Sequence, residues 1–237
     1  MMAPLPSGYK LNHRMTEIIL IRHGETAWNA IKRLQGHLDI ALNAAGMLQA
    51  KALAAALQHE KIDAIISSDL QRARQTAGEI ALLQGVDIGI DANLRERCYG
   101  GFEGFLYSEL AQRFPHEYAL WQSHDPDARF PPMASDAFNT GESIRQFQHR
   151  IVNAIMHHAL RFEGRKIALI AHGGVLECAY RAAKNLALET PREVTIFNAS
   201  INRFLWNGEN IELVQWGDVA HLDNQDAMDE FNQGSTK

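Results

Sequence analysis

Two short apolar runs, each followed at once by a histidine and a glycine, constrain the fold of this chain most. Residues 18–21 lead into Arg22-His23-Gly24, and residues 167–171 lead into His172-Gly173-Gly174. Short, β-branched apolar runs are typical of strands that are buried on both faces of a parallel sheet. In open parallel sheets, ligands bind beyond the carboxyl ends of the strands. The two runs therefore predict neighbouring parallel strands that hold both histidines over one crevice.

Strand and helix patterns alternate along the rest of the chain. Asn43 precedes apolar residues spaced as on one face of a helix, and residues 64–66 resemble a further strand. Residues 68–71 and 143–146 have the Ser-x-x-Gln spacing of a capping box, which predicts a helix start at each. An extended segment and two closing strands are expected at 86–94, 200–206 and 210–216. This alternation predicts an α/β fold with three α/β/α layers around a mostly parallel central sheet.

The length of 237 residues allows one large α/β domain or two small ones. We expect a single catalytic domain at 17–225, flanked by tails at 1–16 and 226–237. Four of the seven prolines lie within about 105–140, interleaved with aromatic residues. That composition predicts a lid of short helices and loops inserted into the domain.

Composition narrows the class of partner. The chain carries 23 basic and 28 acidic residues, a net charge of −5, without a basic block. We therefore expect neither nucleic acid nor a membrane as partner. No apolar stretch approaches the roughly 20 residues that span a bilayer. Cys98 and Cys178 form no disulfide framework, which favours a reduced, cytoplasmic setting.

Two arginines accompany the histidines. Arg22 directly precedes His23, and Arg72 falls near the start of the helix after residues 64–66. Guanidinium groups match phosphate oxygens bidentately and stay charged at any working pH. Taken alone, Arg72 fits a solvated helix position equally well, and a histidine after a strand is more often structural than not. Together, two guanidinium groups and two imidazoles predict a pocket for phosphate.

Competing phosphate and metal motifs fail at specific positions. A thiol phosphatase needs Cys-x5-Arg, but Gly104 and Lys184 stand where the arginine would follow the two cysteines. The chain has neither a Gly-x-Ser-x-Gly elbow nor a Gly-x4-Gly-Lys-Ser/Thr loop. His157 and His158 lack a histidine or carboxylate four residues away, and His158 continues an apolar stripe. We expect no metal, no cofactor, and structural roles for His158 and His221.

A series of motifs now carries a family resemblance. The chain is identified as a member of the histidine phosphatase superfamily, the phosphoglycerate-mutase-like enzymes. The motifs occur in order from residue 17 to about 176: Leu20-Ile-Arg-His-Gly-Glu-Thr, Asn29, Gln35-Gly-x-x-Asp39-x-x-Leu42-Asn-x-x-Gly46, Ser67-Ser-Asp-Leu-x-Arg72-x-x-x-Thr76-Ala, Leu94-Arg-Glu96-Arg-x-Tyr-Gly-x-x-Glu-Gly104, Gly141-Glu-Ser and Ala171-His172-Gly173-Gly174.

The resemblance implies a role for each matching residue. His23 would be the nucleophile, and Glu96 the general acid that later acts as the base. Glu25 and Glu103 are competing carboxylates, of which Glu103 ranks second as proton donor. His172 would be the third catalytic residue. The phosphoryl group would be surrounded by Arg22, Asn29, Arg72, His172 and Gly173.

The chemistry adds two expectations about protonation. His23 must be neutral to attack, so an acceptor such as a backbone carbonyl should fix its tautomer. His172 is expected to be protonated, because a cation there would replace the magnesium that kinases use on the phosphoryl oxygens.

Within the family, the resemblance separates phosphatases from mutases. The glycolytic mutases carry a lysine shortly after the Glu96 motif and an Arg-Arg pair in the lid, whereas this chain has Tyr107 and Gln122-Ser123 nearby. We therefore expect a phosphatase for a small phosphate ester, with a mutase as the alternative. A catalytically inactive phospho-ligand sensor is a further alternative, which the full set of site residues disfavours. A homodimer is possible.

Overall fold

The computed structural model describes residues 14–133 and 140–222. Within these ranges, one six-stranded sheet has the order β3-β2-β4-β1-β5-β6. The pairs β1–β4, β2–β4 and β2–β3 are parallel, whereas β5 is antiparallel to β1 and β6. The strands are β1 (Thr16–Arg22), β2 (Ala64–Ser67), β3 (Ile88–Ile90), β4 (Lys166–Ala171), β5 (Ile201–Trp206) and β6 (Ile211–Asp218).

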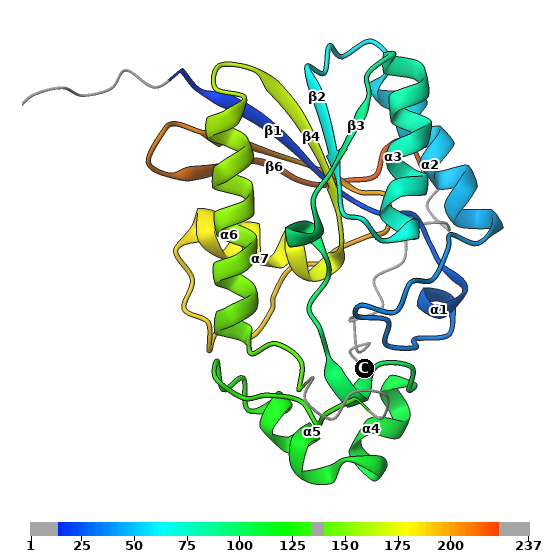
Figure 1. The fold of residues 1–237 in the computed structure, drawn as a ribbon, viewed down its shortest axis with the longest axis vertical. Coiled ribbons are helices and arrows are strands. Elements are labelled where there is room, and N and C mark those ends of the chain that lie inside the picture. Colours follow the sequence, from blue (N-terminus) through cyan, green and yellow to red (C-terminus); the bar gives the residue numbers. More distant parts are fainter. Residues whose placement is uncertain (1–13, 134–139, 223–237) are drawn as a thin grey trace, which may run out of the picture.

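Helices cover both faces of the sheet (Figure 1), which confirms the predicted three layers around a mostly parallel sheet. The helices are α1 (Ala27–Ala30), α2 (Ala44–Leu57), α3 (Gln71–Gln84), α4 (Tyr107–Arg113), α5 (Pro115–Gln122), α6 (Ile144–Arg161) and α7 (Gly173–Lys184), with short 3₁₀ turns at Ala92–Leu94 and Gly100–Phe102.

Strand β1 shows why the apolar runs define the sheet. Successive side chains of a strand point to opposite faces. Ile18 and Leu20 pack into the cluster formed with α6 and α7, whereas Ile19 and Ile21 pack into the cluster formed with α2 and α3. All four are at most 1% exposed. Each such burial contributes roughly 1.5–3 kcal/mol, so the run is apolar without alternation because both faces are covered.

The predicted helix starts agree with the structure at two of three positions. The side chains of Asn43 and Ser143 accept hydrogen bonds from the first turns of α2 and α6. The capping box predicted at 68–71 is wrong, because the N-cap of α3 is Leu70. Ser68 lies before the helix and its hydroxyl faces the histidine site instead. The segment expected to be extended at 86–94 forms only the short strand β3 before a 3₁₀ turn.

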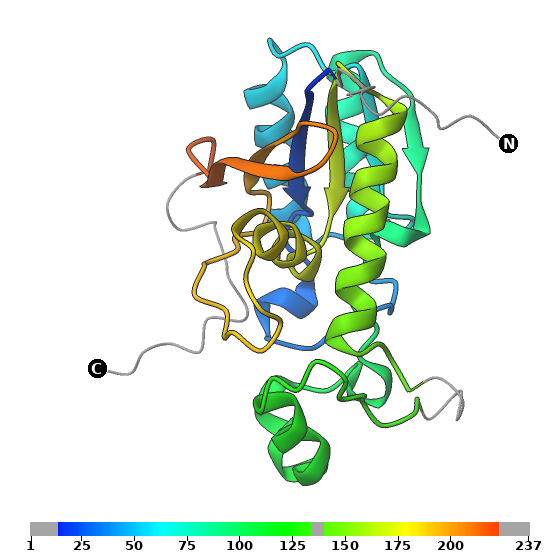
Figure 2. The ribbon, with the colours of Figure 1, turned by 90° about the vertical axis from the view of Figure 1, so that its left-hand side faces the viewer.

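The lid region, α4 and α5 with the chain that follows to residue 133, lies beyond the N-terminal end of α6 (Figure 2). It has an aromatic core of its own: Phe102 and Phe130 pack with Leu34, Tyr99 and Leu110. Part of the predicted lid, including Phe138, falls outside the described residues. Thr16, the last residue of the predicted N-terminal tail, is the first residue of β1 and is buried.

Candidate active site

His23 and His172 follow the two central parallel strands. Arg22, the last residue of β1, is in register with Ala171, the last residue of β4. The two imidazole rings therefore lie edge to face, with their centroids 5.2 Å apart. This confirms the prediction that neighbouring strands hold both histidines at one edge of the sheet.

His23 is held as a neutral imidazole. Its Nδ1 donates to the carbonyl of Gly24 at 2.6 Å, which leaves the lone pair on Nε2. The pKa of His23 lies well below its ordinary value because the ring is buried, with the charges of Arg72 and Arg22 adding to the effect. The backbone is also fixed, since the Asn198 side chain donates to the His23 carbonyl at 3.1 Å. The expected carbonyl acceptor is therefore present.

His172 differs from the expected protonated form. Its Nδ1 accepts a hydrogen bond from Nε of Arg72 at 3.2 Å, so that nitrogen carries no proton. Its Nε2 lies 2.9 Å from the hydroxyl of Ser68, to which it donates in the neutral tautomer. Burial, followed by the charges of Arg72 and His23, sets the pKa of His172 well below its usual value. A buried imidazole next to a guanidinium stays neutral because a second cation there would be repelled.

The two predicted arginines are buried and held by backbone carbonyls. Arg72 is 1% exposed and donates to the carbonyls of Leu38 and Gly36, both at 2.8 Å. Arg22 is fully buried and donates to the carbonyl of Ile196 at 2.6 Å. These contacts give each guanidinium a fixed orientation, so two positive charges are placed at the edge of the sheet in advance of any ligand.

Glu96 enters the site between two backbone amides. Its carboxylate accepts hydrogen bonds from the Arg97 N–H at 2.7 Å and from the Gly174 N–H at 3.0 Å. Burial raises the pKa of Glu96, while these amides and the charges of Arg72 and Arg22 oppose the shift. A Cβ on Gly174 would lie 2.3 Å from Oε1 of Glu96, so only glycine allows this approach.

The competing carboxylates are tied into the backbone elsewhere. Glu25 accepts a hydrogen bond from the Asn43 side chain at 2.6 Å. Glu103 accepts from the N–H of Tyr99 at 2.8 Å and packs beneath Gly36, where a Cβ would lie 2.1 Å from its Oε1. Neither residue lines the small pocket that contains His23. Glu96 is therefore the carboxylate of the three that faces this histidine.

That small pocket, of about 10 Å³, is lined by three of the predicted residues, His23, Arg72 and Glu96. Gly173 is outside its lining: it begins α7 and is buried, with His172 as the N-cap, and a helix N-terminus favours an anion. Asn29 is buried in the capping box of α1, where its Oδ1 accepts from the Thr26 N–H at 3.0 Å. The pocket is lined by His23, Leu34, Gln35, Gly36, Arg72, Glu96, Tyr99 and Tyr107.

The family follows from comparison with known proteins. A family model described as the histidine phosphatase superfamily (branch 1) matches residues 18–219. The chain belongs to this superfamily. The match covers the sheet, the lid and both strand-end histidines, which agrees with the motifs read from the sequence.

The chain is similar to proteins named as phosphatases and as mutases. Phosphoglycerate mutase-like protein 4 of Arabidopsis thaliana is 37% identical over 210 residues, 87% of each chain. The metal-independent phosphoserine phosphatase of the same plant is 32% identical over 230 residues, 96% of this chain and 92% of the relative. A solved phosphoserine phosphatase from Entamoeba histolytica, in complex with 3-phosphoglyceric acid, is 25% identical, with a TM-score of 0.76 over 88% of this chain and 100% of that one. The comparisons confirm the family, the fold and the phosphatase assignment predicted from the sequence.

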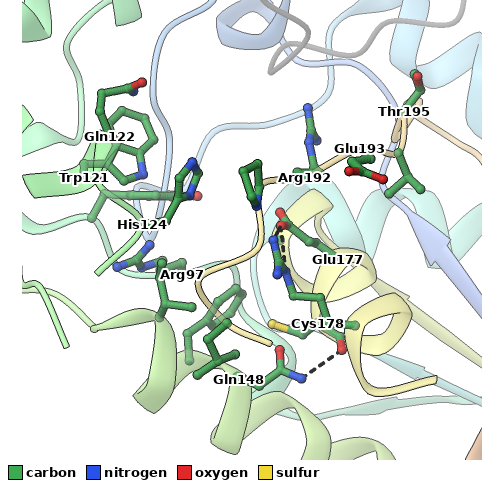
Figure 3. Close-up of a pocket in the computed structure, with 18 of the residues that line it drawn as sticks. Arg97, Trp121, Gln122, His124, Gln148, Glu177, Cys178, Arg192, Glu193 and Thr195 are labelled. Carbon is green, nitrogen blue, oxygen red and sulfur yellow. Dashed lines mark hydrogen bonds and ion pairs between the residues drawn. The ribbon is translucent and has the colours of Figure 1, made fainter. Parts of the chain in front are cut away.

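A larger cavity of about 490 Å³ adjoins the small pocket in this superfamily member, since Tyr99 and Tyr107 line both. Figure 3 shows its walls: Trp121 and His124 of the lid region lie on one side, and Glu177 of α7 lies on the other. The segment 188–195, between α7 and β5, contributes much of the remaining wall. An ester whose phosphate enters the small pocket would place its remaining atoms here.

Arg97 is the most buried cation lining this larger cavity, ahead of the ion-paired Arg181. It is 6% exposed, its Nε donates to the Glu142 carbonyl at 3.0 Å, and its guanidinium lies 4.5 Å from the Phe130 ring centroid. Burial lowers its pKa. In the part of the chain that the structure describes, Arg97 has no carboxylate partner. Buried charges are ordinarily paired, so a guanidinium like this favours an anionic group of a ligand.

Several residues of the site were not found from the sequence. Ser68 orients His172, Asn198 holds the His23 backbone, and Gly174 donates to Glu96. The sequence did give an indication for Gly174, because a second glycine after the histidine suggests that another group lies close to the backbone there. In the structure that group is the carboxylate of Glu96. Asn198 and the segment 188–195 lie in a connection without a periodic pattern, so no local signal marked them.

His158 and His221 have contacts that fit the structural roles expected for them. His158 is buried and bonds to Asp91 at 2.8 Å, and His221 lies 3.1 Å from the Ala199 carbonyl. Across the described residues, no group of three or more histidine, cysteine or acidic side chains is placed to hold a metal ion. No helix in these ranges is both long and apolar enough to cross a membrane.

Proposed function

We propose that the chain hydrolyses small phosphate monoesters through a phosphohistidine at His23. One observation carries the proposal: a neutral His23, the buried Glu96 and the buried Arg72 line one pocket, and the buried Arg22 directly precedes His23. A neutral imidazole beside a carboxyl group of raised pKa supports the proposal, because nucleophilic phosphoryl transfer needs an unprotonated nucleophile and a proton donor.

In the first step, Nε2 of His23 attacks the phosphorus and the bond from phosphorus to the ester oxygen breaks. The leaving oxygen takes a proton from Glu96, because burial raises the pKa of this carboxyl group and so favours its protonated form. Arg22 and Arg72 stabilise the charge on the phosphoryl oxygens, and each such donor contributes roughly 10²–10³ in rate. Asn29 and the start of α7 at Gly173 add hydrogen bonds.

In the second step, Glu96 is ionised and acts as the base. It accepts a proton from a water molecule as the water oxygen attacks the phosphorus, and the bond from phosphorus to His23 breaks. Inorganic phosphate leaves, His23 returns to its neutral form and Glu96 is again protonated.

The larger cavity favours a substrate with an anionic group besides its phosphate. Arg97 presents a buried guanidinium to it, while Glu177 and Glu193 line the same cavity. A phosphorylated carboxylic acid matches this arrangement, and the relatives named for phosphoserine and for 3-phosphoglyceric acid point to the same chemical class. Two buried cysteines without a disulfide fit a reaction in the cytoplasm.

The mutase alternative rests on the relative named phosphoglycerate mutase-like. A mutase must retain the substrate while it reorients. Tyr107 begins α4 at the pocket, and Gln122 ends α5 at the wall of the larger cavity. These neutral side chains stand near the positions of the mutase cations, so hydrolysis is favoured.

Trapping the intermediate tests the proposal. Brief incubation with a ³²P-labelled ester followed by denaturation should give an acid-labile, base-stable phosphoenzyme, which His23→Ala does not form. Steady turnover of p-nitrophenyl phosphate should fall at least about 10³-fold in that variant. EDTA should leave the activity intact, because the arginines neutralise the phosphoryl charge.

Three outcomes would contradict this assignment. Labelling that persists in His23→Ala would place the phosphate on another residue. Strong inhibition by EDTA would require a metal. Conversion of 3-phosphoglycerate into its 2-phospho isomer faster than release of inorganic phosphate would make the chain a mutase.

A further inference from the structure

The Gly141-Glu142-Ser143 motif has no part in the reaction as described above. Ser143 caps α6 through the N–H of Gln146. Gly141 has a φ of +70°, and a Cβ there would lie 2.6 Å from the carbonyl of Cys98. The glycine thus brings the start of α6 against the chain just after Glu96, which leaves the carboxylate of Glu142 to be explained.

Glu142 binds that neighbouring segment at several points. Its N–H donates to the Cys98 carbonyl at 2.9 Å, and its Oε2 accepts from the Cys98 N–H at 3.0 Å. Its own carbonyl accepts from Nε of Arg97 at 3.0 Å. Burial would raise the pKa of Glu142, but the hydrogen bonds and charge of Arg150 outweigh it and lower the pKa. Glu142 is therefore an ionised anchor for residues 97 and 98.

Arg150, two turns along α6, holds the other side of Glu96. Its Nε and Nη2 donate to the two oxygens of Glu142 at 2.7 and 2.6 Å. Its remaining N–H groups donate to the carbonyls of Asn93, Arg95 and Glu96 at 2.8, 3.0 and 3.1 Å. Since a guanidinium has five N–H donors, every donor of Arg150 is used. The pair is about one-fifth exposed.

These contacts fix the chain on both sides of the proposed proton donor. The carbonyl of Glu96 also accepts from Nε2 of His37 at 2.8 Å. The Glu96 carboxylate points the other way, to the N–H groups of Arg97 and Gly174. Displacing a reacting group by about 1 Å can cost on the order of 10² in rate, so anchoring of this backbone bears on catalysis.

We propose that Arg150 and Glu142 are positioning residues that hold Glu96 for proton donation to the leaving oxygen. The inference rests on the proposed function, because it assumes that Glu96 is the general acid. Neither side chain lines the small pocket, so the pair acts through the backbone of residues 93–98. The pair also connects the chain at the end of the lid insertion, at Glu142, to the segment that carries Glu96.

Leaving-group dependence distinguishes positioning from general stabilisation of the fold. Phenyl phosphate and p-nitrophenyl phosphate are similar in size, but the nitrophenolate leaves without much help from a proton. We expect Arg150→Met to lower kcat/KM for phenyl phosphate by on the order of 10–10², and for p-nitrophenyl phosphate at most a few-fold. Arg150→Lys and Glu142→Gln should show the same pattern to a smaller extent.

Two reference variants make the result decisive. Glu96→Gln should show the same leaving-group dependence, at larger size. Arg145→Met removes an exposed ion pair from the same helix, with Asp127 of the lid region, and should affect both esters equally and slightly. An equal loss on both esters in the Arg150 and Glu142 variants would overturn the inference. If Glu96→Gln itself lacked the dependence, the acid assignment would fail, and the inference with it.

Discussion

The floor of the site and the lid region use opposite kinds of side chain. The floor, formed by the ends of β1, β2 and β4 with the start of α7, buries charged and polar groups such as Arg22, Arg72 and His172. The lid region packs aromatic side chains on one another: the Phe102 ring lies 5.1 Å from both Phe114 and Phe130. The two regions therefore depend on different interactions.

The kind of interaction determines how rigidly each region holds its side chains. Floor groups are attached to strand ends and held by backbone donors and acceptors, so their geometry is fixed by the sheet. Aromatic pairs contribute roughly 0.5–1.5 kcal/mol each beyond their burial and tolerate changes of contact. We therefore infer that the floor determines the reaction, whereas changes in the lid region and at Arg97 beside it alter the choice of substrate and leave the chemistry unchanged.

Removing a floor arginine should have the largest effect. We expect Arg72→Met to lower kcat by about 10²–10³, because a charge aligned with the phosphoryl oxygens and the bond to His172 are both lost. The loss should be similar for every ester. Steady-state assays over several esters measure it, with Arg74→Met as the matched control, since Arg74 is an exposed arginine on the same helix. A loss confined to one ester would assign Arg72 to substrate selection.

The floor was largely predictable from the sequence, for a physical reason. Residues 18–21 and 167–171 are continuous apolar runs, and parallel neighbours must end at the same edge, so His23 and His172 were expected together. The neutral state of His172 was not predicted. It depends on the hydrogen bonds of the ring with Arg72 and Ser68, which reach it from another strand end. The sequence placed Arg72 near the phosphate but did not indicate these two bonds.

For the lid region, the sequence predicted only the type of structure, short helices and loops, and not its contacts. Prolines among aromatic residues indicated short helices, and α4 and α5 are short. The buried position of Arg97 could not be foreseen, because it depends on Phe130 and on the carbonyl of Glu142, which are distant in sequence. Contacts between irregular segments leave no periodicity to read, which is why the reaction was predictable and the ester was not.

Replacing Arg97 should have a smaller and more selective effect. We expect Arg97→Met to lower kcat/KM for a carboxylated ester such as phosphoserine by about 10–10², the equivalent of one charge-assisted hydrogen bond. For p-nitrophenyl phosphate, which has no carboxylate, the change should be a few-fold at most. Arg129→Met is the control, since Arg129 is an exposed arginine that does not line the larger cavity. Equal losses on both esters would make Arg97 part of the floor.

The smallest expected effect is on the free energy of unfolding at low pH. Acid destabilises the floor because it favours protonation of the buried histidines. His172 has a folded pKa well below 6.5, so the unfolded chain binds a proton at a higher pH than the folded chain does. The stability from the neutral ring is thus complete above about pH 6.5 and is lost as the pH falls below it. His23 acts in the same direction, whereas the raised pKa of Glu96 opposes it.

His172→Asn should therefore cost stability at pH 8, through its lost contacts with Arg72 and Ser68, and cost less at pH 5. Urea unfolding of both proteins at the two pH values measures the difference. His172→Gln, with a longer amide, checks that the trend does not depend on one replacement. If the two proteins differ by the same amount at both pH values, burial does not keep this imidazole neutral. A larger cost at pH 5 than at pH 8 would mean that the folded pKa is raised, and the floor would then hold a protonated histidine before any ligand binds, as the chemistry of the phosphoryl group alone had led us to expect.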